Sequence, residues 1–340
     1  MAAKRRSLPP RRAKVALVST GGTIAMEGRG PYDWVDYAES GIVRDAAEVL
    51  AKLSDTLPDV PLEAVPFRRF GSTAIGTADW LELAKLIARL VTRRDIAGVV
   101  VTHGTATLEE TAWMLALTVA TRKPIVLTGA QRPPNTAGSD AAPNLRGAIL
   151  AAAAPALNGL GVMVVMDNRI HDARSVTKLA NHDLDAFQSP ESGPLGRLAA
   201  DGRIVLRRRP MPMPARRPWR LSSLRALPRV DIVYSYAGAD GVAVKALVAA
   251  GARGIVLAGL PPGRPANRQR EALAKAARAG VAVVLASRAI NGIVEPAADA
   301  ARDGFLNAGD LSPLKARILL MLALSAVRHP TRIQAILDQF

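Results

Sequence analysis

The sequence predicts a two-domain α/β protein, with a larger N-terminal domain built on a parallel or mixed sheet flanked by helices and a smaller C-terminal α/β domain with a parallel sheet. The chain has 340 residues, the usual size of two domains. Hydrophobic residues make up 49% of it, which is enough for sizeable cores. Strand-like apolar runs alternate with helical patterns in both halves.

Strands and helices of the first half are predicted from the spacing of apolar residues. Runs of β-branched and other apolar residues predict buried strands at 14–19, 65–70, 99–101, 124–127 and 161–166. Apolar residues three and four positions apart predict helices at 45–53, 79–89 and 140–154, and another that starts after 107. Thr107 and Glu110 have the spacing of a capping box at the start of that last helix.

The second half repeats the alternation. Strands are expected at 230–234, 254–257 and 281–285, and helices at 242–250, 267–277 and 313–327. Arginines and prolines crowd the region before them, as in a linker between domains. The predicted parts are a flexible basic tail at 1–13, an N-terminal domain at 14–205, a linker at 206–228 and a C-terminal domain at 229–340.

Composition narrows the classes of function. Cysteine is absent and the four histidines are not paired at metal-ligand spacing, so neither a metal site nor a disulfide framework is expected. No secretory signal or membrane-length apolar stretch is visible, which predicts a cytoplasmic protein without membrane contact. The net charge of +16 permits nucleic-acid binding through the tail and linker, but acidic residues are interspersed and few aromatics accompany the basic runs. A solvated arginine-rich surface is therefore preferred.

Four polar loops follow strands of the first half, at 20–23, 72–73, 102–107 and 128–134. In a parallel sheet such loops gather at one edge, where open α/β sheets bind ligands. They present many hydroxyl groups, and Lys178 follows the β-branched pair Val176 and Thr177. A hydroxyl nucleophile activated by a lysine is a recognised form of covalent catalysis. The Gly- and Pro-containing segment 28–37 is expected to form a lid that moves.

Several motifs carry a resemblance to a known family. They are TGGTIA at 20–25, VTHGTATLEETA at 101–112, TGAQRP at 128–133 and VTK at 176–178, followed by VDIVYSYAGADGVAVKALV and LSPLKARILLMLAL in the second half. Together they resemble the bacterial L-asparaginase family over nearly the whole chain beyond the tail. The resemblance implies hydrolysis of the side-chain amide of asparagine or glutamine to the acid and ammonia, without a cofactor, by a homodimer or homotetramer.

The resemblance also assigns residues. It implies that Thr23 is the nucleophile on a mobile loop and that Tyr37 belongs to the lid. It also implies that Thr105 is the second catalytic threonine and that Lys178 is the lysine paired with it. Ser72 matches a ligand of the substrate's α-carboxylate, and Ala130 matches a backbone contact to the side-chain amide. The remaining substrate-binding positions are Thr73, Gly104 and Ala106.

Ligands for the substrate's α-ammonium depart from the family pattern. Ala106 stands where the family has an aspartate, Thr73 where a glutamine is frequent, and Gly238 where an asparagine is found. For the glutamate that a neighbouring subunit supplies, Glu295 and Asp299 are the candidates. Burying an ammonium group without partners costs several kcal/mol. Either the substrate lacks a free α-ammonium, or another carboxylate replaces the aspartate.

Three readings of function follow. The first is an amidohydrolase that acts on asparagine or on a related amide or lactam, with a neutral Lys178 taking the proton of Thr105. The second is a ligand-binding homologue without activity, which Ala106 favours and the set of Thr23, Thr105 and Lys178 opposes. The third is nucleic-acid binding. His103 is expected to be structural, and Glu109 and Glu110 to serve as capping groups.

Overall fold

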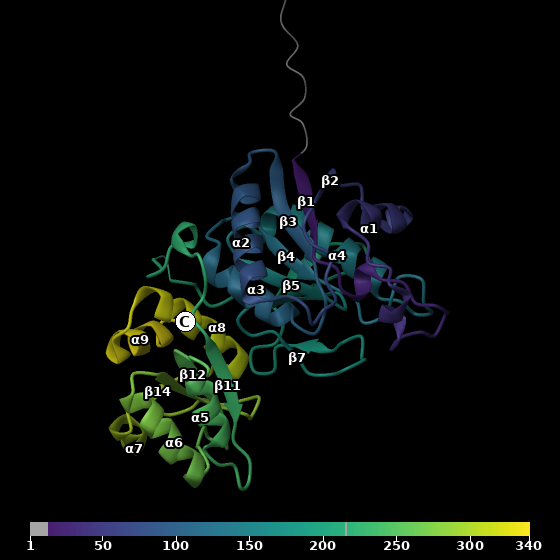
Figure 1. The fold of residues 1–340 in the computed structure, drawn as a ribbon. Helices are drawn as coiled ribbons and strands as arrows, with labels where there is room; N and C mark the ends of the chain where they lie inside the picture. Colours follow the sequence, from purple (N-terminus) through teal and green to yellow (C-terminus); the bar gives the residue numbers. More distant parts are fainter. Residues whose placement is uncertain (1–12, 215) are drawn as a thin grey trace, which may run out of the picture.

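The computed structural model describes residues 13–214 and 216–340, so all but the last residue of the predicted tail lies outside the described residues. Two main sheets with helices on their faces confirm the predicted α/β architecture (Figure 1). One sheet is built from residues before 207 and the other from residues after 229. None of the helices in the described ranges is long and apolar enough to cross a membrane.

The larger sheet has eight strands in the order β10-β9-β6-β5-β4-β3-β1-β2. Its strands are β1 (Lys14–Ser19), β2 (Leu62–Val65), β3 (Ile96–Thr102), β4 (Ile125–Thr128), β5 (Val162–Met166), β6 (Arg169–Asp172), β9 (Gly196–Leu198) and β10 (Ile204–Leu206). The first five are parallel and the last three pair antiparallel, so the sheet is mixed. A separate two-stranded ribbon joins β7 (Thr177–Lys178) to β8 (Phe187–Gln188).

Helices cover both faces of the parallel strands (Figure 1). They are α1 (Ala46–Lys52), α2 (Thr77–Thr92), α3 (Leu108–Thr118) and α4 (Ala141–Ala153). Alternate residues of β3 lie on the two faces of the sheet, because successive side chains of a strand point to opposite sides. Val99 and Val101 join the core cluster of α2 and α3, whereas Val100 joins the cluster of α1 and α4. This double burial explains the continuous valine run.

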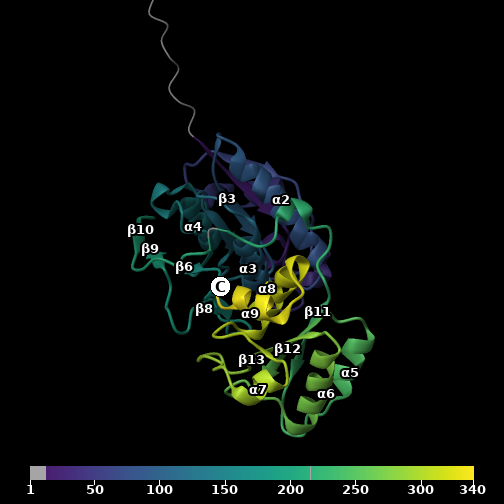
Figure 2. The ribbon, with the colours of Figure 1, turned by 90° about the vertical axis from the view of Figure 1, so that its left-hand side faces the viewer.

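The smaller sheet is entirely parallel, in the order β11-β12-β13-β14. Its strands are β11 (Val230–Tyr234), β12 (Gly254–Gly259), β13 (Ala282–Ser287) and β14 (Leu306–Asn307). The helices of this half are α5 (Val242–Ala249), α6 (Asn267–Arg278), α7 (Ala298–Arg302), α8 (Pro313–Ala326) and α9 (Pro330–Leu337). Figures 1 and 2 both place α8 and α9 between the smaller sheet and the N-terminal domain.

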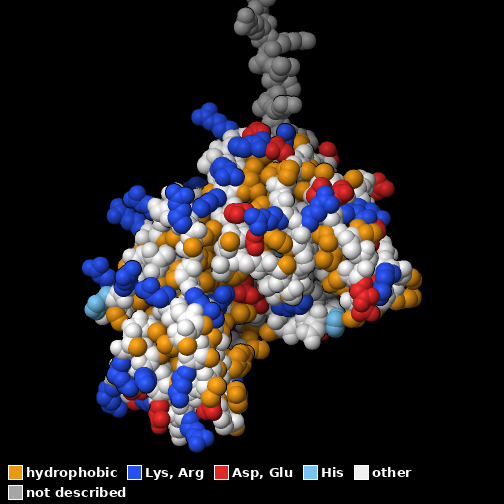
Figure 3. All heavy atoms as spheres, viewed as in Figure 1, with side chains coloured by type: hydrophobic (Ala, Val, Ile, Leu, Met, Phe, Trp, Pro, Cys, Tyr) orange, Lys and Arg blue, Asp and Glu red, His pale blue; other side chains and the backbone are white. Residues whose placement is uncertain are grey.

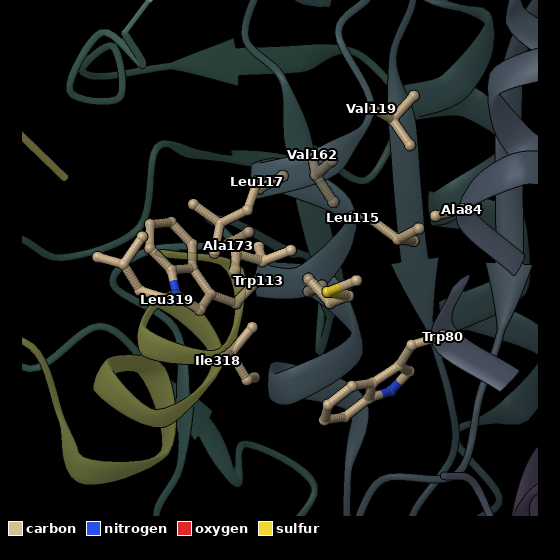
Figure 4. Packing of buried hydrophobic residues seen from close by; sticks show 14 of the residues in the cluster. Trp80, Ala84, Trp113, Leu115, Leu117, Val119, Val162, Ala173, Ile318 and Leu319 are labelled. Carbon is tan, nitrogen blue, oxygen red and sulfur yellow. The ribbon is translucent and has the colours of Figure 1, made fainter. Parts of the chain in front are cut away.

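A single buried cluster joins the two domains. It contains residues of α2, α3 and the larger sheet together with residues of α8, α9 and the smaller sheet. Figure 4 shows Trp113 of α3 lying against Ile318 and Leu319 of α8. Trp219, in the stretch between the sheets, is also buried and donates its indole N–H to Leu117 O at 2.9 Å. The two sheets therefore share apolar core, rather than only a connecting chain.

Two local predictions were wrong. The strand expected at 65–70 lies at 62–65, because Pro66 lacks the N–H that a longer strand would need. The capping box at Thr107 is not formed. Instead, Thr107 Oγ1 donates to Ser72 O at 2.8 Å, and Glu110 turns toward Arg317 of α8 at 3.7 Å.

Candidate active site

The loops after β1, β3 and β4 meet at the carboxyl edge of the larger sheet, where these three strands are neighbours. Backbone hydrogen bonds tie the loops together: Thr20 N donates to Thr102 O at 3.0 Å, and His103 N donates to Thr128 O at 2.8 Å. The segment after β2 joins them through Phe70 N, which donates to Thr20 O at 2.8 Å. All four predicted polar loops thus reach one edge.

Two glycines permit the closest approach of these loops. Gly22 has φ +77°, and a Cβ built on it would lie 2.3 Å from the Cα of Gly104. A Cβ on Gly104 would in turn lie 2.3 Å from the Cβ of Ser72. The backbones that carry Thr23, Thr105 and Ser72 are therefore in direct contact, and no larger residue fits between them.

Thr23 is buried at the start of a short 3-10 helix, and its hydroxyl lies 2.7 Å from the hydroxyl of Tyr37. Tyr37 belongs to the segment that the sequence predicts to be a lid. This segment rests on the loop after β4: the amide of Asn135 bonds both Gly28 N and Gly28 O, at 2.8 and 2.7 Å. The geometry places the predicted nucleophile and the predicted lid tyrosine within hydrogen-bond distance.

Thr105 and Lys178 form the second pair of the site. Lys178 Nζ donates to Thr105 Oγ1 at 2.9 Å and to Gln131 Oε1 at 3.1 Å. Thr105 is buried and Lys178 is half-buried. Burial lowers the pKa of Lys178 because it disfavours the charged form, while the carboxylates of Asp140 and Glu109 raise that pKa. The lowered pKa increases the fraction of neutral amine, the form that can accept a proton.

The backbone of residues 174–178, the segment that carries Lys178, is held from two sides. Lys178 N donates to Glu109 Oε1 of α3 at 3.1 Å. From α8, the buried Lys315 donates its ammonium group to Arg174 O and Val176 O. Burial lowers the pKa of Lys315 to about 8, although the carboxylates near it oppose that shift. A helix of the C-terminal domain therefore fixes the segment that delivers Lys178.

The other positions predicted to bind substrate in the N-terminal domain differ in their exposure. Ser72 is half-buried beside Gly104, and Ala130 is fully buried. Thr73 and Ala106 are exposed. No group of three metal-binding side chains occurs within residues 13–214 and 216–340.

Gly238, Glu295 and Asp299 all lie in the C-terminal domain. Gly238 is exposed in the loop after β11, with φ +83°. Asp299 is paired with Arg264 at 3.0 Å and Arg270 at 2.7 Å, and these guanidinium groups hold the pKa of its carboxyl well below the usual range. Glu295 is exposed. Of the two acids, Asp299 is committed to partners within its own domain.

Sequence reasoning gave no role to three residues that organise the site. Asp140, at the start of α4, accepts hydrogen bonds from Gln131 N and Arg132 N at 3.0 Å. Gln131 contacts Lys178 Nζ, and Lys315 donates to the carbonyl of Val176, two residues before that lysine. Two of them carried a signal, since Gln131 stands beside Ala130 in the TGAQRP motif and Lys315 is the lysine of LSPLKARILLMLAL. Asp140 lies in none of the quoted motifs, and no motif shows which backbone N–H groups it accepts from.

The chain is similar to known proteins over nearly its whole length. Residues 14–212 match the family described as "Asparaginase, N-terminal", and residues 229–337 match "Glutaminase/Asparaginase C-terminal domain". L-asparaginase 2 of Escherichia coli is 39% identical, covering 96% of this chain and 93% of the relative. A probable periplasmic L-asparaginase of Haemophilus influenzae is 35% identical, covering 96% and 93%. The crystal structure of a probable cytoplasmic L-asparaginase from Campylobacter jejuni superimposes with a TM-score of 0.87 at 34% identity, covering 96% of this chain and all of that one.

Proposed function

Because this chain belongs to the bacterial L-asparaginase family, and is an amidohydrolase acting on the carbon–nitrogen bond of linear amides, we propose that it opens a side-chain carboxamide with Thr23 as nucleophile and the Thr105–Lys178 pair as proton carrier. L-Asparagine is the first substrate to test. The observation that carries the proposal is the 2.9 Å contact between Lys178 Nζ and the buried Thr105 hydroxyl. It lies at the sheet edge where the Thr23 loop abuts the Thr105 loop.

The reaction divides into two steps. In the first, Thr23 Oγ1 attacks the carboxamide carbon, the C–N bond breaks, and the hydroxyl proton leaves with the nitrogen as ammonia. The Tyr37 hydroxyl, 2.7 Å from Thr23 Oγ1, is placed to carry that proton. In the second, a neutral Lys178 takes the proton of Thr105, and Thr105 takes one from water. The water oxygen attacks the ester carbon, Lys178 returns its proton through Thr105 to the Thr23 oxygen, and the acid leaves with the Thr23 hydroxyl restored.

A second candidate substrate class is a carboxamide or lactam without a free α-ammonium. Ala106 next to Thr105 and Thr73 next to Ser72 carry no charge, and both are exposed. A substrate's α-ammonium group that binds here loses its hydration, so a carboxylate from another part of the protein would have to offset that cost. N-acylated, deaminated and cyclic amides avoid that cost.

An ammonia-release assay decides between the classes. The purified protein is given asparagine and glutamine, then the N-acetylated and deaminated analogue of each, and a lactam. A KM for free asparagine at or below the millimolar range, with fast turnover, supports the first class. A preference for the blocked or deaminated amides supports the second. If no compound yields ammonia, the chain is a ligand-binding homologue rather than an active amidohydrolase.

Intact-mass measurement with a slow substrate tests the nucleophile. We expect a mass increase equal to the acyl group, which Thr23→Val abolishes and Ser72→Ala does not. An unchanged mass throughout turnover would assign the attack to Thr105 or to water.

Assembly and location are part of the same proposal. We propose a homodimer or homotetramer, in which Glu295 rather than the paired Asp299 would be free to reach a neighbouring subunit's site. Light scattering on the purified protein measures the number of subunits. A cytoplasmic location also stays a proposal, because the names of the relatives include both a cytoplasmic and a periplasmic enzyme.

A further inference from the structure

Gln131 is the second contact of the lysine amine, and the chain orients its side chain strictly. Its amide nitrogen donates to two backbone carbonyls, Asn181 O at 3.2 Å and Asp183 O at 3.0 Å. Its amide oxygen accepts from Lys178 Nζ at 3.1 Å. A flipped amide would turn its oxygen toward two carbonyl oxygens and its N–H groups toward a lysine that has only donors when charged. The surroundings therefore allow one orientation.

The backbone of Gln131 is held as firmly as its side chain. Its N–H donates to both carboxylate oxygens of Asp140 at 3.0 Å, and the residue is 8% exposed. Asp140 is fixed in turn by the amide of Asn144 at 2.9 Å. A residue fixed at both ends can hold its partner in a defined place.

Carboxylates surround the amine without accepting its hydrogen bonds in the described structure. Glu109 of α3 accepts from the backbone N–H of Lys178, and Asp140 before α4 accepts from the backbone of the Gln131 loop. From α8, the ammonium group of Lys315 binds carbonyls of the same segment. The atoms within hydrogen-bond distance of Lys178 Nζ are thus the neutral oxygens of Thr105 and Gln131.

We propose that Gln131 is a positioning residue, whose neutral amide oxygen aims Lys178 at Thr105 without holding the amine in its charged form. The inference rests on the proposed role of Lys178 as the base. An N–H of the neutral amine donates to Gln131 Oε1, which leaves the nitrogen lone pair for the Thr105 proton. An ionised carboxylate at the same place would orient the amine equally well. It would also favour the ammonium form, which cannot accept a proton.

Gln131→Glu is the discriminating variant, since it keeps an acceptor oxygen and adds a charge. We expect the acid limb of the pH–rate profile to move to higher pH by about 1 to 2 units, because a nearby opposite charge raises a lysine pKa by that order. At a pH below both limbs this is a loss of about 10- to 100-fold. Gln131→Met removes the acceptor, so kcat falls while the limb does not move to higher pH.

Gln188→Glu is the matched control, because it adds the same charge beside Arg169, on a residue of β8 that pairs with Thr177 and therefore faces the other side of the ribbon from Lys178. It should leave the limb in place. A limb that is unmoved in Gln131→Glu, or that moves equally in Gln188→Glu, would overturn the inference. Circular dichroism confirms that each variant is folded.

The titration of Lys178 can also be followed without activity. Lysine labelled with ¹³C at Cε gives an NMR signal for each side chain, and the signal absent from Lys178→Met belongs to Lys178. Gln131→Glu should raise the pKa of this signal, and Gln188→Glu should not. If the wild-type protein hydrolyses no amide, the proposed function fails, but the NMR titration still decides whether Gln131 sets the charge state of the amine.

Discussion

His103 stands two residues before Thr105, yet the structure gives it no free ring nitrogen. Trp80 donates its indole N–H to Thr111 Oγ1 at 2.8 Å, so the hydroxyl proton of Thr111 is free for His103 Nε2 at 2.9 Å. The proton on Nδ1 then faces Gly104 O, also at 2.9 Å. Burial lowers the pKa of His103 to about 4, which keeps the ring neutral. The histidine therefore holds the Thr105 loop, and Lys178 is the proposed base.

The first prediction concerns that lysine. Lys178→Met should lower kcat for amide hydrolysis by about 100- to 10,000-fold, the usual contribution of a general base. The fold should survive, because methionine fills the same space. Lys123→Met is the matched control, since Lys123 is also partly buried and bonds a backbone carbonyl, Arg93 O. Ammonia release and urea unfolding of both variants give the comparison, and substantial activity in Lys178→Met would exclude the proposed base.

Much of the site could be predicted at the residue scale, because its motifs are short and local. Thr23, Thr105 and Lys178 are marked by TGGT, HGT and VTK, and the structure brings Thr105 and Lys178 into contact. Gln131 was not assigned a role. Its orientation depends on carbonyls of Asn181 and Asp183, about 50 residues further on, and a sequence pattern does not show which amide atom faces the amine.

At the scale of elements, periodicity predicted the strands and helices with long apolar patterns and missed those without them. β1 and β11 have the bounds expected from their valine-rich runs. The antiparallel pieces β6 to β10 were not predicted, because they are two to four residues long and all but β10 carry polar side chains. The loops between the parallel strands were harder still, since their shapes depend on contacts between loops.

The second prediction tests those contacts. Gly104→Ala places a methyl group where only 2.3 Å separates it from the Cβ of Ser72, so the two loops must move apart. We expect a loss of about 1 to 3 kcal/mol in the free energy of unfolding. Activity should fall strongly, because the Thr105 loop shifts relative to Thr23. Gly71→Ala, in the same loop as Ser72, has open space around it and should change neither quantity. Equal effects of the two substitutions would contradict the close-packing argument.

At the scale of the whole molecule, α8 connects the smaller sheet to the site. Its apolar face shares a core with α3, its Arg317 approaches Glu110, and its Lys315 bonds the Arg174–Val176 carbonyls. On the face drawn in Figure 3, Lys and Arg side chains are spread over both domains with Asp and Glu between them. This distribution favours a solvated surface over a nucleic-acid groove.

The third prediction concerns Lys315 and pH. Its pKa is about 8 in the folded protein and about 10.4 in an unfolded chain. Between these values the unfolded chain binds the extra proton, so this group makes the free energy of unfolding rise with pH. The cost of burying the charge is fully present below pH 8. From pH 8 to 10 the wild type should gain about 2 kcal/mol relative to Lys315→Met, measured by urea unfolding at each pH. Parallel pH profiles for the two proteins would contradict a buried, charged lysine.

The fourth prediction concerns cooperativity. Because one apolar cluster spans both domains, we expect them to unfold in a single transition, with tryptophan fluorescence and circular dichroism changing together. Residues 229–340 alone should not fold stably, since α8 would lose its α3 partner. Two separate transitions in the whole chain would show that the shared cluster contributes little.

The direction of β1 has a practical consequence. This strand starts at Lys14 on the edge of the sheet opposite the Thr23 loop, and its six residues span about 20 Å (Figure 1). A carrier bead, fluorescent protein or affinity handle joined before Ala13 would therefore be attached at the edge of the larger sheet opposite the Thr23 loop, where it would not block the substrate. Tethering at that end offers a route to an immobilised catalyst.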